Sequence, residues 1–199
     1  FLFKRFSTKQ RQNGYQSYQQ NPEQQSSSNM FSGAFGNSGQ PPPSTPNIGG
    51  NLLEEGIDQI RENDKNFDPS YFTEVASDVF FQVQAGWMRR DLDSYRHLLG
   101  EQLAGEYAGH FAEMRSKGHI NKLESIAVRT LEIVQAGSDG REDFVTVLFS
   151  ANLLDYTVDD TSGDLIDGSM TTPIKFNEEW TWARLVGTEE WKLEGIKEV

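Results

Sequence analysis

The side chain whose ordinary pKa best suits acid–base chemistry near neutral pH is histidine, and this sequence has three of them and no cysteine. A histidine paired with a carboxylate can act as a general base where the fold brings the two groups together. The candidates are His110, at the edge of an apolar helical stripe, and Asp155, on the inward side of an expected strand. Inside a pocket this pair would suit an isomerase or a dehydratase. The alternative is a half-exposed histidine and a carboxylate at the rim of the fold.

Metal chemistry has weaker support. The lack of cysteine excludes disulfides, thiolate catalysis and cysteine-based zinc sites, and three histidines disfavour a histidine-based one. The carboxylates of the Asp159–Asp164 loop are oxygen ligands of the kind that calcium prefers. Their spacing differs from that of an EF-hand loop. We therefore expect no metal and no other cofactor.

The most extensive candidate site is a set of aromatic and apolar side chains that periodicity directs toward the interior. An apolar pocket of this kind is typical of small-molecule and lipid sites; the alternative is that the side chains simply fill the core. The expected pocket residues are Phe80, Val83, Trp87, Tyr107, Phe111, Phe149, Phe176, Trp180, Trp182 and Arg184. Arg184 shares a strand face with Trp182, so it would contact an anionic headgroup at the pocket mouth or form a surface ion pair.

The elements that must position these residues begin with an expected helix from Asn51 to Asn63, capped by Asn51. Its apolar side chains share one face, namely Leu52, Leu53, Ile57 and Ile60. The opposite face is acidic, whereas helices that lie on membranes carry a face rich in Lys and Arg. We therefore favour packing of this helix (residues 51–66 with its exit) against the domain or a partner over membrane contact.

Further helices are expected before the pattern changes. Asp68 followed by Pro69 is typical of a helix start, and a broad apolar stripe follows as far as Trp87. The expected helices run from Pro69 to Arg90, from Asp91 as cap to Gly100, and over residues 101–117 before Gly118.

After Gly118 the apolar residues recur with a period of two, which is typical of strands. The expected strands are Lys122 to Gln135, Phe144 to Val158, Thr172 to Val186 and Trp191 to Lys197. Helices followed by a meander of strands indicate an α+β fold with the helices on one face of a four-stranded antiparallel sheet.

Residues 1–50 differ in composition from the rest of the chain. They carry four cations and one acid, and residues 7–50 are so rich in Gln, Ser and Pro that we expect a disordered linker. Residues 67–199 instead hold 24 acidic and 12 basic residues, which argues against nucleic acid as a partner.

The first six residues are expected to be the end of a membrane anchor. Apolar residues followed by Lys and Arg are typical of the cytoplasmic end of a transmembrane helix; an ordinary charged terminus is the alternative. The cations that would lie near an anionic membrane surface are Lys4, Arg5, Lys9 and Arg11.

Two stretches resemble a known family. One is Phe67-Asp68…Phe72…Val79-Phe80…Trp87…Asp91-Leu92-Asp93, and the other is Glu179-Trp180-Thr181-Trp182-Ala183-Arg184…Trp191-Lys192-Leu193-Glu194-Gly195-Ile196. Over about residues 67–198 the chain resembles the Tim44-like domain family, that is, the C-terminal domain of a mitochondrial inner-membrane import translocase subunit and its bacterial relatives. The Trp-Thr-aromatic-x-Arg strand followed by Trp-Lys-Leu is the most specific part.

This resemblance implies a cone-shaped fold like that of nuclear transport factor two, with a curved sheet and helices around an apolar pocket. It also implies a non-enzymatic role in membrane association, contact with lipid or an apolar ligand, or binding of a membrane protein. Bacterial relatives place an anchor, a low-complexity linker and this domain in that order, so we expect the bacterial inner membrane with the domain on its cytoplasmic side. The motor-recruiting region of the mitochondrial members has no counterpart here, so their role in protein import is not carried over to this chain.

Overall fold

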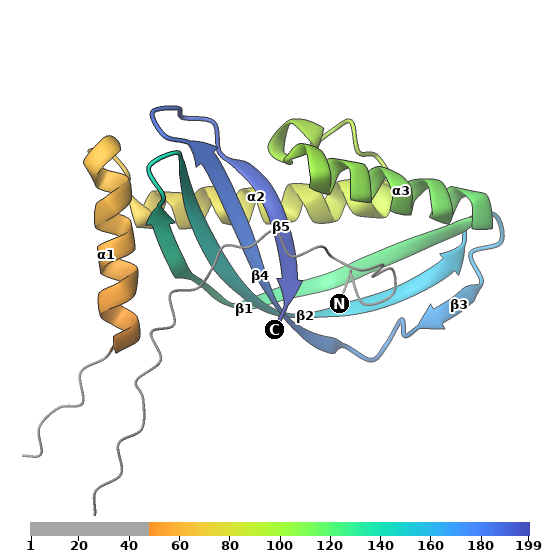
Figure 1. Cartoon of the computed structure of the whole chain (residues 1–199). Coiled ribbons are helices and arrows are strands. Elements are labelled where there is room, and N and C mark those ends of the chain that lie inside the picture. The colour runs from red at the N-terminus through yellow and green to blue at the C-terminus, as the bar shows by residue number, and fades with distance from the viewer. Residues whose placement is uncertain (1–47) are drawn as a thin grey trace, which may run out of the picture.

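The computed structural model describes residues 48–199, which form three α-helices and a five-stranded antiparallel sheet (Figure 1). The helices are α1 (Ile48–Asn63), α2 (Pro69–Arg89) and α3 (Glu101–Lys117). The strands are β1 (His119–Ser138), β2 (Glu142–Asp159), β3 (Leu165–Gly168), β4 (Ile174–Leu185) and β5 (Lys192–Glu198). The expected anchor end and most of the expected linker lie outside the described residues. The α+β prediction is confirmed.

Local signals set the bounds of the two long helices. The Asp68 carboxylate accepts a hydrogen bond from the Ser70 amide at 2.9 Å, so the Asp-Pro pair starts α2 as the sequence indicates. At the end of α3, Gly118 takes a left-handed conformation (φ 66°), which glycine adopts without strain. Both predictions are confirmed.

Helix α1 belongs to the same hydrophobic core as the rest of the fold. It begins at Ile48, so Asn51 lies within its first turns and the prediction that it caps the helix is wrong. Ile60 is fully buried, and a Cβ at Gly56 would overlap the carbonyl of Ala136. Glycine therefore lets the helix lie directly on the backbone at the end of β1. In Figure 1, α1 stands crosswise to α2 beside the hairpin that joins β1 and β2.

The segment between α2 and α3 differs from the expected short helix. Asp91 does not begin a helix; a single 3₁₀ turn, η1 (Arg96–Leu98), forms instead. Gly100 is the N-cap of α3 rather than the end of a helix. Tyr95 is fully buried against Gly86, where a Cβ would overlap its ring. This tertiary contact takes precedence over the helical spacing of the segment.

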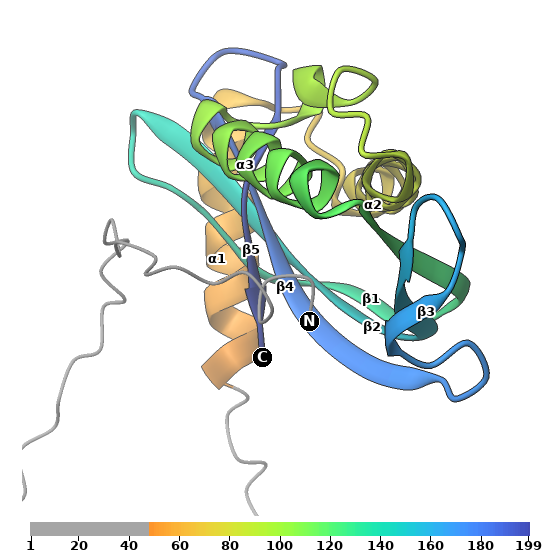
Figure 2. The same ribbon diagram turned by 90° about the vertical axis from the view of Figure 1, so that its right-hand side faces the viewer.

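The sheet has the order β1-β2-β4-β5, and β3 pairs with the far end of β2. Strand β3, which the sequence did not indicate, makes five strands where four were expected. Register shifts interrupt the pairing of β1 with β2 at three places, one of them at Ser125, whose φ is 52°. Because bulges bend strands and increase their twist, they account for the curvature of the sheet. Helices α2 and α3 lie together along one face of it (Figure 2).

Candidate functional site

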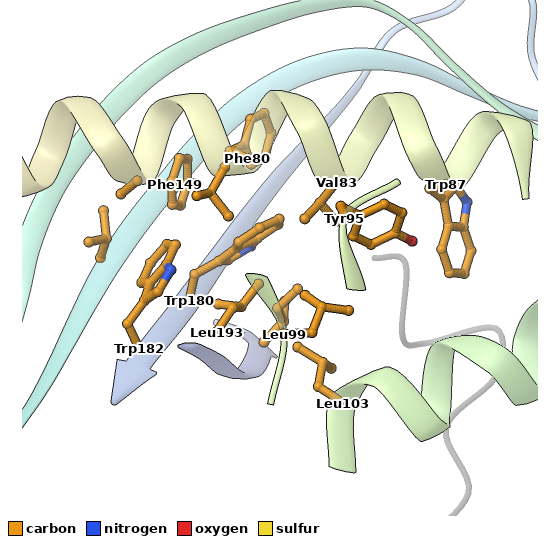
Figure 3. Packing of buried hydrophobic residues seen from close by; sticks show 14 of the residues in the cluster. Phe80, Val83, Trp87, Tyr95, Leu99, Leu103, Phe149, Trp180, Trp182 and Leu193 are labelled. Carbon is orange, nitrogen blue, oxygen red and sulfur yellow. The ribbon is translucent and has the colours of Figure 1, made fainter. Parts of the chain in front are cut away.

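All ten residues expected to line an apolar pocket are buried. Nine of them lie in the hydrophobic core, and Arg184 lies apart from these, beside the junction of α1 and α2. Their rings contact one another. Phe80 stacks on Phe149 with centroids 4.7 Å apart and lies 5.1 Å from Trp180. Trp87 lies 5.3 Å from both Tyr107 and Phe111. Figure 3 shows side chains of α2 directed toward those of β4 and β5. The structure brings the nine aromatic and apolar residues together; that a ligand enters among these rings stays a prediction.

An open cavity lies beside this core, at the junction of α1 and α2 and under the loop between β4 and β5. Its volume is about 650 Å³, which is within the range of ligand pockets. Its floor is aromatic. Phe72 lies 5.0 Å from Trp191 and 5.9 Å from Phe67, and Trp191 lies 6.0 Å from Phe67. We call this cavity the junction groove.

The rim of the junction groove combines exposed apolar and acidic side chains. Tyr71 is 65% exposed and Val75 is 38% exposed, one turn apart on α2. The acidic residues of the lining are Asp64, Asp68, Glu189 and Glu190, and its cationic residues are Lys192 and the buried Arg184. Both cations are already engaged, since Lys192 contacts Glu190 at 3.0 Å and Arg184 is ion-paired. The rim therefore presents apolar surface next to net negative charge.

Arg184 lies beneath the aromatic floor of the groove and contacts it. Its side chain is 4% exposed, and it contacts Asp143, which is fully buried, at 3.1 Å and Asp64 at 2.9 Å. Its guanidinium carbon lies 4.5 Å from the centroid of the Trp191 ring. The ion pair expected at the surface is therefore buried. The arginine joins the end of α1 to the sheet and supports the groove floor.

Of the two residues of the enzyme hypothesis, Asp155 lies on the inward side of its strand, as that hypothesis expects. Asp155 is buried rather than at the rim, and it accepts a hydrogen bond from the Asn121 amide at 2.7 Å. Asn121 accepts in turn from the Trp87 indole at 2.9 Å. His110 lies 6.1 Å from the same indole, and partial burial lowers the pKa of its imidazole below the ordinary value. The side chain that orients Asp155 is thus the amide of Asn121. In the enzyme hypothesis this partner would be the imidazole of His110, which would act as the base.

In the acidic loop after β2, the carboxylate of Asp159 forms hydrogen bonds with backbone amides of the same loop. Asp159 accepts hydrogen bonds from the amides of Ser162 at 2.8 Å and Thr161 at 3.0 Å, which lower the pKa of its carboxyl. The Ser162 hydroxyl donates to Asp164. Among residues 48–199, no three carboxylate or histidine side chains are grouped so as to hold a metal ion. The basic residues Lys4, Arg5, Lys9 and Arg11 lie outside the described part.

Sequence reasoning missed five buried polar side chains: Gln84, Asn121, Asp143, Thr146 and Glu178. Their positions could have been found from periodicity. Glu178 alternates with Phe176 and Trp180 on the inner face of β4, and Gln84 lies on the stripe of Phe80 on α2. These residues were not predicted to be buried, because only apolar side chains were used to find the buried faces of helices and strands.

In comparisons with known proteins, residues 53–198 match the sequence model of the Tim44-like domain family. The match begins inside α1, earlier than residue 67, where the resemblance was expected to start. A search of the curated proteins finds no match. Among solved structures, the intermembrane space region of the chloroplast protein ARC6 is similar, with a TM-score of 0.44 and 10% identity over 67% of this chain and 98% of that one. Over residues 48–199, no helix is long and apolar enough to cross a membrane.

Proposed function

Because the chain belongs to the Tim44-like domain family, whose members generally associate with membranes, interact with proteins or lipids and are non-catalytic, we propose that it is a membrane-tethered binding module. The tether is the basic N-terminal segment, at the inner membrane of a bacterium with the domain on the cytoplasmic side. The binding surface is the junction groove. The observation that carries the proposal is an aromatic floor next to an acidic rim, within one cavity of about 650 Å³.

The chemistry of the groove favours a protein segment as its occupant. An aromatic or aliphatic side chain would bury its surface on Phe72 and Trp191, and the exposed ring of Tyr71 would cover it. A Lys or Arg next to that side chain would meet Glu189 at the rim, which increases the association rate and the specificity. An anionic lipid headgroup would meet the same carboxylates and be repelled. We therefore propose a segment with an apolar side chain flanked by basic residues.

This proposal predicts a charge-dependent peptide interaction. An array of peptides, each with one Phe, Trp or Leu flanked by Lys, Ser or Glu, would be probed with the full chain. The Lys-flanked peptides are expected to bind best, and Tyr71→Ala is expected to weaken the best one about 5- to 30-fold, a loss of about 1–2 kcal/mol, because the ring would be buried against the apolar side chain of the peptide. Fluorescence anisotropy measures the dissociation constant.

The matched control for Tyr71→Ala is Phe81→Ala, which removes an exposed ring of α2 outside the groove lining. It is expected to leave peptide affinity unchanged. The double substitution Glu189→Lys and Glu190→Lys should reverse the preference toward Glu-flanked peptides. Equal affinity for the Lys- and Glu-flanked peptides, or an equal loss with both alanine variants, would contradict the assignment of the groove.

The membrane tether gives a separate prediction. Anionic vesicles are expected to bind the full chain, and replacing Lys4, Arg5, Lys9 and Arg11 by alanine should lose up to about 4 kcal/mol, at about 1 kcal/mol per charge. This is roughly a thousandfold in the partition coefficient at low salt, measured by vesicle sedimentation. Lys65→Ala with Lys197→Ala removes charge from the domain and serves as control. Binding that is insensitive to the four N-terminal charges but lost with Tyr71→Ala would instead place lipid in the groove.

A further inference from the structure

A second, much smaller cavity lies inside the domain, between α2, β1, β2 and β4. Its volume is about 10 Å³, close to the space that one water molecule needs. Apolar side chains form most of its wall, contributed by Leu123, Leu153, Ile174 and Phe176. Three polar side chains converge on it from different elements: Gln84 of α2, Asp155 of β2 and Glu178 of β4.

Gln84 is the unusual member of this group. It is 1% exposed, and neither its amide nitrogen nor its carbonyl oxygen has a hydrogen-bond partner among the described residues. A buried amide without partners is strongly disfavoured, because burial removes the hydrogen bonds that it makes with water in the unfolded chain. The side chain requires a partner that both donates to its oxygen and accepts from its nitrogen.

The two carboxylates are held in place by donors from the core. Asp155 accepts from Asn121 at 2.7 Å, and Glu178, itself 1% exposed, accepts from the indole of Trp180 at 2.9 Å. No Lys or Arg lines the cavity. Its polar wall therefore consists of one amide and two oriented carboxylates, so it offers several acceptors and a single donor group.

We propose that this cavity is a binding site for one internal water molecule that joins Gln84 to one of the two carboxylates, Asp155 or Glu178. Water donates two hydrogens, to the amide oxygen and to a carboxylate, and accepts from the amide nitrogen through its lone pairs. An ammonium ion would fit the volume of the cavity and could donate to the carboxylates. It has no lone pair, however, to accept a hydrogen bond from the amide nitrogen of Gln84. The bridge connects α2 to β2 or to β4 at the centre of the fold, according to which carboxylate accepts the second hydrogen. The proposal is independent of the junction groove.

The substitution Gln84→Met tests the proposal, because the two possible states of the site give opposite signs. If the site holds a water, methionine removes the amide groups with which that water forms hydrogen bonds, and the carboxylate is less well solvated. The melting temperature of the full chain should then fall by about 3–8 °C. Without a water, methionine replaces an unsatisfied amide by an apolar group of similar shape, and the melting temperature should rise. Gln82→Met, at an exposed position of the same helix, is the matched control and should change little.

A direct observation on the unsubstituted chain makes the test independent of how well the variant folds. NMR cross-relaxation between the side-chain amide protons of Gln84 and a long-lived water is expected, and it should disappear in Gln84→Met. A melting temperature that rises or stays unchanged in Gln84→Met overturns the proposal, as does a wild-type spectrum without a water contact at Gln84. Neither result would bear on the peptide binding proposed for the groove.

Discussion

Replacing Arg184 by methionine is expected to lower the free energy of unfolding by about 3–5 kcal/mol. The arginine is the ion-pair partner of Asp143, which is fully buried, and also contacts the half-exposed Asp64. Without the guanidinium, the charge of Asp143 remains in the interior, where its desolvation is strongly unfavourable. Methionine retains much of the apolar contact with Trp191, so the loss reports mainly on the charge. Urea denaturation measures it.

Two further substitutions separate the contributions of the carboxylates. Asp143→Asn, introduced with Arg184→Met, removes the unpaired charge and should recover part of the lost stability. Asp64→Asn is expected to cost about 1 kcal/mol or less, because this carboxylate is partly exposed to water. If Arg184→Met and Asp143→Asn lower the stability additively, the two side chains do not act as a pair.

Trp180→Ala is expected to lower the free energy of unfolding by at least about 3–5 kcal/mol. The indole is fully buried and lies 5.1 Å from Phe80, 5.3 Å from Phe149 and 6.1 Å from Trp182. Alanine leaves a large cavity at the meeting point of these rings, and it also removes the donor that holds Glu178. Calorimetry or urea denaturation gives the loss.

Trp180→Phe serves as the comparison for this prediction. It keeps most of the ring contact but removes the indole N–H, so the Glu178 carboxylate loses this hydrogen bond, which should cost about 1–3 kcal/mol. The alanine variant should therefore be clearly less stable than the phenylalanine variant. Equal losses in the two variants would mean that the hydrogen bond, and not ring packing, gives Trp180 its importance.

Much of the architecture follows from local signals in the sequence. Asp68 and Pro69 start α2 and Gly118 ends α3, because capping depends on residues only a few positions apart. The inner face of β2 also follows, since side chains alternate along any strand. The alternating residues from Val145 to Leu153 are accordingly all buried.

Elements that depend on distant contacts were not predictable in this way. The spacing between Asp91 and Gly100 suits a helix, yet the segment bends so that Tyr95 can pack on Gly86. Strand β3 is only four residues long and all four are exposed, so it lacks an alternation of buried and exposed side chains and is defined by its pairing with β2. The shifts in register that curve β1 likewise result from its pairing with a neighbouring strand.

For the candidate site residues, too, some features follow from local patterns in the sequence and others depend on distant contacts. The sequence by itself determined which side chains face inward, including the aromatic set around Trp180 and the strand that carries Arg184, because periodicity reports orientation. Only the tertiary structure decided that these rings pack against one another, that Asp155 is bound by Asn121, and that Arg184 meets Asp64 across 120 positions of the chain. Distances between elements depend on how whole faces pack, and no local pattern contains that information. The junction groove therefore became visible only in the folded domain.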